Sequence, residues 1–217
     1  MDISQAIAQI SVWVLPVLFA ITLHEAAHGY VARHYGDMTA YQAGRISLNP
    51  LRHIDPMGTL LVPLLMFFTV GFLFGWAKPV PVNFARLRNP KKDMLWVALA
   101  GPAANLFMAF LWLILLKWAL HSGGGNAASW VFEMAKAGIT INMALMVLNL
   151  LPLPPLDGGR IAVSLLPQPY SYRFSKIEPY GMIILIVLLM LEFNIQGGFI
   201  LSPLVQHSIN LLLSLFA

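Results

Sequence analysis

Two histidines and a glutamate carry the clearest chemical signal in the chain. His24-Glu25-Ala-Ala-His28 matches the pattern HExxH. On a helix, a spacing of four residues places both imidazoles on one face, as two ligands of a single tetrahedral zinc ion require. Glu25 projects from the adjacent position, where its carboxylate can accept a proton from a water whose pKa zinc lowers to about 7. These residues predict a zinc site with hydrolytic chemistry.

The alternative is a chance pairing of two structural histidines with an exposed glutamate between them. Residues around the motif are strongly apolar, as in a membrane helix. Three ionisable side chains in such a helix are costly unless they are paired, bound to a metal or turned toward water. The setting therefore favours the metal site.

A catalytic zinc site needs a third protein ligand and an open fourth position. The chain has no cysteine, so this ligand must be a histidine or a carboxylate. Asp157 is the best candidate, because Pro152, Pro154 and Pro155 interrupt the helix just before it. Irregular backbone near a membrane boundary is tolerated where it is buried in protein or lines a cavity. The alternative is that Asp157 caps a short helix through Leu166.

The composition is that of an integral membrane protein. Hydrophobic residues make up 59% of the chain, charged residues 10%, and the mean hydropathy is +0.74. A soluble domain with so few charges could not cover its own surface. A net charge of +4 could indicate nucleic acid as the partner of a soluble protein. Here the basic residues lie between apolar runs, so we expect a lipid bilayer and no nucleic acid. We expect residues 1–217 to form one membrane-embedded domain.

Long apolar runs predict an all-α polytopic membrane protein with about five to six transmembrane helices, since about 20 apolar residues cross a bilayer. The first run has no basic leader and no cleavage site before the HExxH motif, so we interpret it as a helix of the mature protein. A further run, Leu60–Trp76, contains Pro63 and two glycines and could cross the membrane or form a re-entrant hairpin. The five clearest runs are Ile3–Tyr35, Met94–Leu120, Trp130–Leu151, Lys176–Phe193 and Phe199–Phe216.

The proposed ligands set the direction of these helices. His28 lies near the end of the first run and Asp157 just beyond the third, so the first and third helices must be parallel and the second antiparallel. Leu60–Trp76 then makes no net crossing, which favours the re-entrant hairpin. In this arrangement all but two of the thirteen Lys and Arg residues, Lys117 and Lys136, fall on the side of the site. The positive-inside rule therefore predicts a site that faces the cytoplasm.

Three motifs follow one another along residues 24–160. They are the HExxH of His24–His28, Gly101-Pro102-Ala-Ala-Asn105, and Asn149-x-x-Pro152 followed by Leu156-Asp157-Gly158. In their order and content the chain resembles the site-2 protease family of intramembrane zinc metalloproteases, in particular the bacterial members without PDZ or nucleotide-sensing domains. The resemblance implies a zinc metalloendopeptidase of the bacterial inner membrane that cleaves transmembrane segments of membrane-protein substrates.

The resemblance also implies a catalytic role for Asn149. This residue matches the family position that contacts the substrate or stabilises the tetrahedral intermediate. An amide near the metal can donate a hydrogen bond to a developing oxyanion. The alternative is structural: Asn142 and Asn149 are seven residues apart and share a helix face, where they could form a polar seam between helices.

Two stretches punctuated by proline and glycine, Ala43–Asn49 and Lys78–Phe84, predict extended backbone. We hypothesise that Gly44–Asn49 and Val80–Asn83 form short strands that hold an unwound substrate by edge pairing. Such unwinding is needed because a helix shields the carbonyl groups that a protease must reach.

Other polar residues favour structural roles. Gly101, Asn105 and Ala109 recur at every fourth position, which predicts a small-residue stripe for close helix packing. His53 and Asp55 could support the zinc ligands, although a turn stabilised by Asp55 is the favoured interpretation.

Two other functions would use the same residues. A transporter or channel could bind a permeating ion with them, and a non-catalytic scaffold could keep zinc as a structural ion. The sequence shows no internal inverted repeat, which counts against a transporter. Glu25 is not needed for zinc ligation, and its presence counts against a scaffold.

Overall fold

The computed structural model describes residues 3–62, 65, 75–122, 125–195, 198 and 200–215. These residues are mostly helical and include no strand, so the predicted all-α class is confirmed for them. The long helices are α1 (Ile3–His34), α4 (Pro90–His121), α5 (Asn126–Leu150), α8 (Glu178–Asn194) and α9 (Leu201–Ser214). The short ones are α2 (Thr39–Gln42), α6 (Asp157–Leu165), α7 (Tyr170–Ser175), η1 (Pro50–His53), η2 (Pro56–Leu61) and η3 (Phe84–Arg86).

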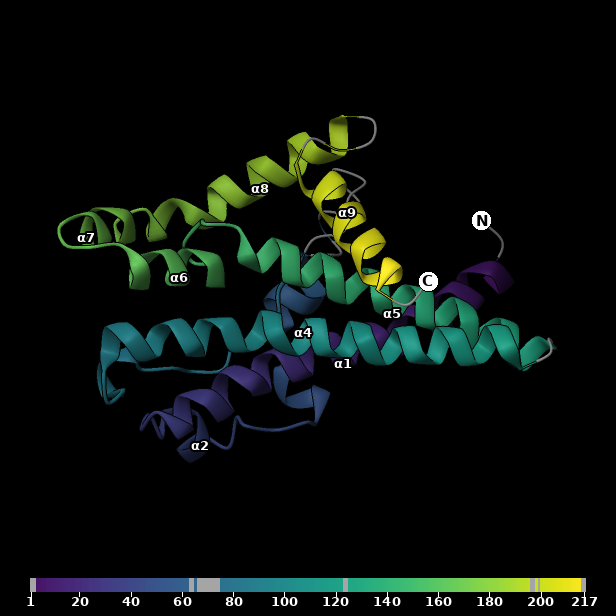
Figure 1. Ribbon diagram of the computed structural model, residues 1–217, viewed down its shortest axis with the longest axis horizontal. Coiled ribbons are helices and arrows are strands. Elements are labelled where there is room, and N and C mark those ends of the chain that lie inside the picture. Colours follow the sequence, from purple (N-terminus) through teal and green to yellow (C-terminus); the bar gives the residue numbers. More distant parts are fainter. Residues whose placement is uncertain are drawn as a thin grey trace.

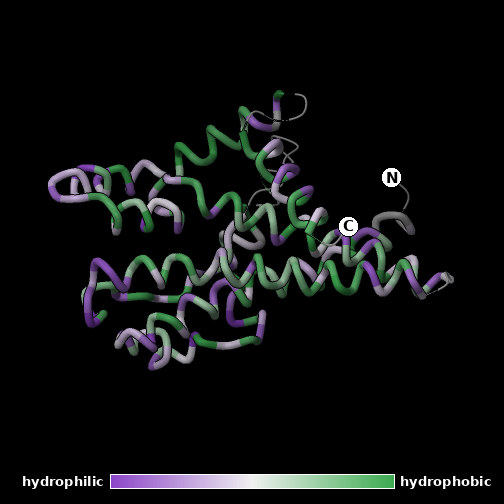
Figure 2. Tube along the Cα trace, in the orientation of Figure 1, coloured by the Kyte–Doolittle hydropathy of each residue, from purple (hydrophilic) through white to green (hydrophobic). Residues whose placement is uncertain are grey.

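Helices α1, α4 and α5 lie side by side at the centre of the molecule (Figure 1). α1 and α5 run in one direction and α4 in the opposite one, which is the alternation that the ligand positions require. All three are long and apolar enough to cross a membrane, over Ile7–His34, Pro90–His121 and Asn126–Leu150. Hydrophobic residues occupy the middle of the bundle, and hydrophilic residues gather toward its ends (Figure 2).

α8 and α9 correspond to the fourth and fifth apolar runs. At 1.5 Å per residue, the 17 residues of α8 cover about 26 Å and the 14 residues of α9 about 21 Å. Both lengths are below the ~30 Å of a bilayer's hydrocarbon core. Three spanning helices are therefore found in the described part of the chain, and the larger number stays a prediction. The predicted re-entrant hairpin at Leu60–Trp76 lies mostly outside the described residues.

The core of the bundle forms where α4, α5 and α9 meet. The buried side chains there belong to Ala109, Leu113, Ile139, Met143 and Leu212. α4 and α5 approach closely at Gly138, where an added Cβ would overlap the ring of Trp112. This contact holds α5, and therefore the segment that follows it, in register with α4.

The two stretches predicted as strands, 43–49 and 78–84, contain no strand, so that prediction is not confirmed. The second stretch lies against the end of α1 instead. The backbone N–H of Asn83 donates to Oδ2 of Asp37, just beyond α1, at 2.6 Å. The Asp37 carboxylate thus accepts a hydrogen bond that the carbonyl group of a neighbouring strand would otherwise accept.

Candidate metal centre

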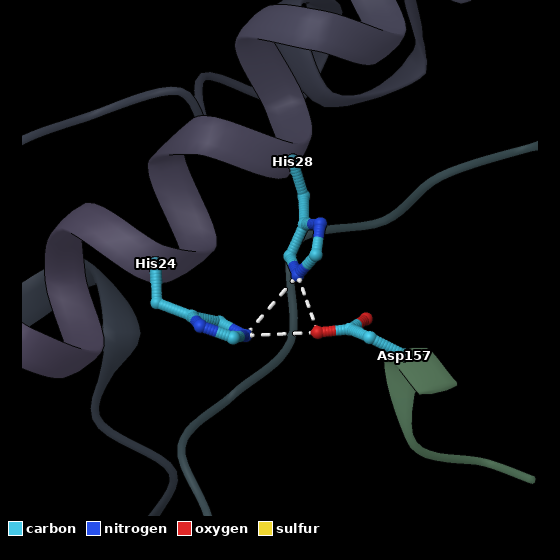
Figure 3. Close-up of side chains that lie close together, drawn as sticks. All are labelled: His24, His28 and Asp157. Atoms are coloured by element: carbon cyan, nitrogen blue, oxygen red, sulfur yellow. Dashed lines mark hydrogen bonds and ion pairs between the residues drawn. The ribbon is translucent and has the colours of Figure 1, made fainter. Parts of the chain in front are cut away.

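The three predicted ligands converge at one point (Figure 3). His24 and His28 project from α1, and Asp157 is the first residue of α6. Nε2 of each histidine lies 3.3 Å from Asp157 Oδ2, and the two Nε2 atoms lie 3.2 Å apart. A tetrahedral ion with bonds of about 2.0–2.1 Å separates its ligand atoms by about 3.3–3.4 Å. The triangle therefore has the dimensions of one face of a zinc coordination sphere.

The hydrogen bonds around the triangle also point to a cation. Nδ1 of His24 lies 2.6 Å from Oδ1 of Asn105, and Nδ1 of His28 lies 2.7 Å from the carbonyl of Val97. Both partners are acceptors, so each Nδ1 carries a proton, and Nε2 is the nitrogen that each imidazole turns into the triangle. Oδ2 of Asp157 is buried there without a hydrogen-bond donor among the described residues. A positive charge, from a bound cation or from a proton on an imidazole, is needed to hold these three atoms 3.2–3.3 Å apart.

The charge and position of Asp157 suit a ligand. Burial raises the pKa of its carboxyl, but the imidazoles of His24 and His28 outweigh burial and lower the pKa to about 2. The side chain is therefore a carboxylate at neutral pH, the form that binds metals. The N-cap residue of α6 is Leu156, and no side-chain capping bond is formed there. The alternative of Asp157 as a helix cap is therefore wrong.

Two glycines allow the chain to bring Asp157 back toward α1. α5 ends at Leu150, where the prolines begin, and α6 then folds against the segment just before it. A Cβ on Gly158 would overlap the carbonyl oxygen of Leu150, and a Cβ on Gly159 would overlap the backbone of Pro154. Only residues without a side chain fit this close approach, which accounts for the Asp-Gly-Gly sequence.

Glu25 lies beside the triangle on the wall of a small pocket. The pocket has a volume of about 180 Å³ and is also lined by the three ligands and Asn149. Because a water molecule occupies about 30 Å³, this space accommodates a water together with a peptide carbonyl group. Oε2 of Glu25 accepts a hydrogen bond from the backbone N–H of Val80 at 2.7 Å. The sequence did not predict this contact, which connects the 78–84 segment to the site.

Asn149 lies at the pocket, while Asn142 does not line it. The Nδ2 of Asn149 donates to the carbonyl of Leu145, one turn earlier in α5, at 3.0 Å. Asn142 is completely buried and hydrogen-bonds Asn105 of α4 at 3.0 Å. The two asparagines thus have different surroundings, and Asn142 alone forms the interhelical bond expected of a polar seam.

His53 and Asp55 lie outside the group of ligands. Oδ1 of Asp55 accepts from the N–H groups of Met57 and Gly58 at 2.8 and 2.9 Å, so it caps η2. The favoured interpretation of Asp55 as a turn residue is confirmed. His53 is buried and bonds the carbonyl of Ser47 at 2.9 Å.

A cavity larger than the site pocket lies away from the ligands. It has a volume of about 650 Å³ and is bounded by α1, α4 and α5, with Tyr30, Pro102 and Leu150 among its lining residues. Its walls are almost entirely apolar, and His34 is the one imidazole among them. Bond hydrolysis needs converging polar groups, so we assign the chemistry to the smaller pocket.

Gly101 is a site residue that the packing interpretation missed. A Cβ at this position of α4 would lie 2.5 Å from Nε2 of His28 and 2.6 Å from Nε2 of His24.

Gly101→Ala is therefore expected to displace both imidazoles and to lower the zinc content of the purified protein to a small fraction of the wild-type value, as measured by elemental analysis. Ala103→Leu adds bulk at an exposed position of the same helix and should leave the zinc content unchanged. Full zinc occupancy in Gly101→Ala would contradict the geometry.

Comparisons with known proteins agree with a metalloprotease site. Residues 119–191 match the model of peptidase family M50. Over 208 residues the chain is 36% identical to "Putative zinc metalloprotease YwhC" of Bacillus subtilis, which covers 94% of this chain and 90% of that protein. It is 32% identical over 194 residues to "Putative zinc metalloprotease Rip2" of Mycolicibacterium smegmatis, covering 87% and 71% of the two chains. No solved structure gives a significant match.

Proposed function

Because this chain belongs to peptidase family M50, the site-2 protease family of zinc metalloproteases, we propose that it hydrolyses peptide bonds in transmembrane segments of membrane proteins. One observation carries the proposal. A triangle of ligand atoms with edges of 3.2–3.3 Å adjoins the Glu25 carboxylate, and both imidazoles of the triangle project from α1, a helix long and apolar enough to cross a bilayer. A protease site in that position meets substrates that are themselves in the membrane.

We assign His24, His28 and Asp157 as the zinc ligands and Glu25 as the general base and acid. When bound, zinc acidifies a water and polarises the scissile carbonyl. The Glu25 carboxylate accepts the proton of the attacking water and passes it to the leaving amine. The N–H of Val80, 2.7 Å from Oε2, holds this carboxylate at the pocket wall, and Oε1 takes the proton. The ordered backbone of the 78–84 segment thus contributes to the placement of the base.

Asn149 is the proposed electrophilic partner of Glu25. One N–H of its amide is used by the carbonyl of Leu145, and the second is available to the pocket that Asn149 lines. A donor in this position stabilises the negative charge that develops on the substrate's carbonyl oxygen. The carbonyl of Leu145 in the same helix fixes the direction of the Asn149 amide. The amide therefore needs little reorganisation to donate to the oxyanion.

We further propose that residues 1–217 form a single domain of the bacterial inner membrane with five to six crossings and a cytoplasmic site. The directions of α1, α4 and α5 support this arrangement. Arg33 in the last turn of α1 and Lys91 and Lys92 in the first turn of α4 lie at one end of the bundle, and Lys117 lies near the opposite end of α4. Basic residues concentrate on the cytoplasmic side of membrane proteins.

Strand addition by residues 80–83 stays a hypothesis within this proposal. Pro79 and Pro81 carry no N–H, and Val80 donates to Glu25, so this edge offers a substrate mainly carbonyl oxygens. Unchanged cleavage after substitution of Pro81 and Val82 would remove the hypothesis.

The proposed function is tested by expressing the chain together with candidate single-span membrane proteins and mapping new termini by mass spectrometry. We expect cuts within or beside the transmembrane segment, which disappear when zinc is chelated. A transporter or a non-catalytic scaffold would leave every substrate intact. Cuts confined to soluble domains far from the membrane would also contradict the proposal.

A further inference from the structure

Helix α4 supplies no ligand, yet it contacts both imidazoles. Asn105 lies 2.6 Å from Nδ1 of His24, across 81 residues of sequence, and its own side chain is fully buried. Val97, two turns earlier, gives its carbonyl to His28 at 2.7 Å. One helix therefore contacts both imidazoles through the ring nitrogens that face away from the ligand triangle.

The amide of Asn105 can adopt only one orientation. Its Nδ2 lies 3.2 Å from the carbonyl of Ala20 and 3.0 Å from Oδ1 of Asn142. The Ala20 carbonyl can only accept a hydrogen bond, so the NH₂ group must face it, and Oδ1 must face His24. Asn142 is held in turn, because its Nδ2 donates to the carbonyl of Gly138 at 2.8 Å. A buried chain of hydrogen bonds thus runs from α5 through α4 to α1.

We propose that Asn105 is the positioning residue of His24 and that Asn142 holds Asn105 in the orientation that this task requires. The inference rests on the proposed function, in which His24 binds zinc. An amide oxygen carries no proton, so it selects the His24 tautomer with hydrogen on Nδ1 and leaves the Nε2 lone pair for the metal. Ala20 and His24 are one turn apart on α1, so Asn105 fixes both the ring and the backbone that carries it.

The test measures zinc binding by the purified full chain in competition with a chelator of known affinity. Loss of a partner of this kind typically weakens metal binding about 10–100-fold. We expect Asn105→Leu to raise the zinc dissociation constant by that factor and to change the visible absorption spectrum of the cobalt(II)-substituted protein. Asn142→Leu should cause a smaller increase, because Ala20 still orients the Asn105 amide.

Asn105→Asp distinguishes positioning from packing. Burial among acceptors keeps the introduced carboxyl protonated, so that one oxygen accepts from Nδ1 of His24 while the O–H donates to the carbonyl of Ala20. Zinc affinity and the cobalt spectrum should therefore stay close to those of the wild type. If Asn105 served only helix packing, a buried carboxyl would be at least as harmful as leucine. Leu113→Ala, in the core between α4 and α5, is the matched control: it should lower the melting temperature and leave zinc affinity unchanged.

The outcomes separate the two levels of the proposal. Failure of the wild-type chain to bind zinc would overturn the proposed function itself. Zinc binding by the wild type that is unaltered in Asn105→Leu would overturn only the positioning role. Should Asn105→Leu fail to fold, Asn142→Leu decides, since unaltered affinity and an unaltered cobalt spectrum in that variant would contradict the hydrogen-bonded chain.

Discussion

Glu25→Gln is expected to lower the rate of substrate cleavage by about 10²–10⁴-fold, the usual contribution of a general base, while the zinc content stays unchanged. The amide has the shape of the carboxylate and can still accept the N–H of Val80, which lies 2.7 Å from Oε2 in the wild type. It cannot take a proton from water. Cleavage is measured with a single-span substrate and the purified protein, and zinc by elemental analysis of the same sample.

The matched control for this variant is Glu133→Gln. Glu133 lies on α5, has a side chain that is 54% exposed, and pairs with Lys136 at 3.3 Å. This substitution removes the same charge at a distance from the pocket and should leave cleavage unaffected. Wild-type cleavage by Glu25→Gln would show that another group moves the proton. Equal loss in both variants would indicate a general effect of charge or folding.

Asp157→Ala is expected to abolish both zinc retention and cleavage. The carboxylate is one corner of the ligand triangle, 3.3 Å from each imidazole nitrogen, and its removal leaves two protein ligands for an ion that needs three. Loss of a hydrogen-bond partner of a ligand weakens metal binding by about 10–100-fold. Because Asp157→Ala removes a ligand itself, the zinc dissociation constant should rise by more than that factor. Elemental analysis after purification and titration with a chelator measure the effect.

Asp55→Ala serves as the control for Asp157→Ala. Asp55 caps η2 through the N–H groups of Met57 and Gly58, so its removal costs about 0.5–2 kcal/mol of local stability. It lies outside the ligand group, and zinc content should not change. Full zinc occupancy in Asp157→Ala would mean that the third ligand is a different residue.

The helices and the ligand pair were predictable because they depend on local spacing. Four residues between His24 and His28 bring both imidazoles to one face of any α-helix, whatever surrounds it. The apolar runs predicted the five long helices, with ends that differ by a few residues from those observed. Asp157 was predictable by elimination, since the chain lacks cysteine and prolines interrupt the helix before it.

The contacts that complete the site depend on how separate helices approach one another. Asn105 and Gly101 fit the pattern of a packing stripe, and nothing in their spacing reveals that α4 turns this stripe toward the imidazoles. Residues 78–84 have the composition of extended backbone, but the N–H groups of Val80 and Asn83 bond carboxylates rather than a strand.

The sequence by itself predicted the proposed metal ligands, the proposed base and the long helices of this protein, because each follows from periodicity and side-chain chemistry along one stretch of chain. Only the tertiary structure decided which groups orient those ligands. Asn105 meets His24 across 81 residues, and Val80 meets Glu25 across 55. Such contacts arise from the sum of many packing interactions between helices, and no local pattern encodes that sum.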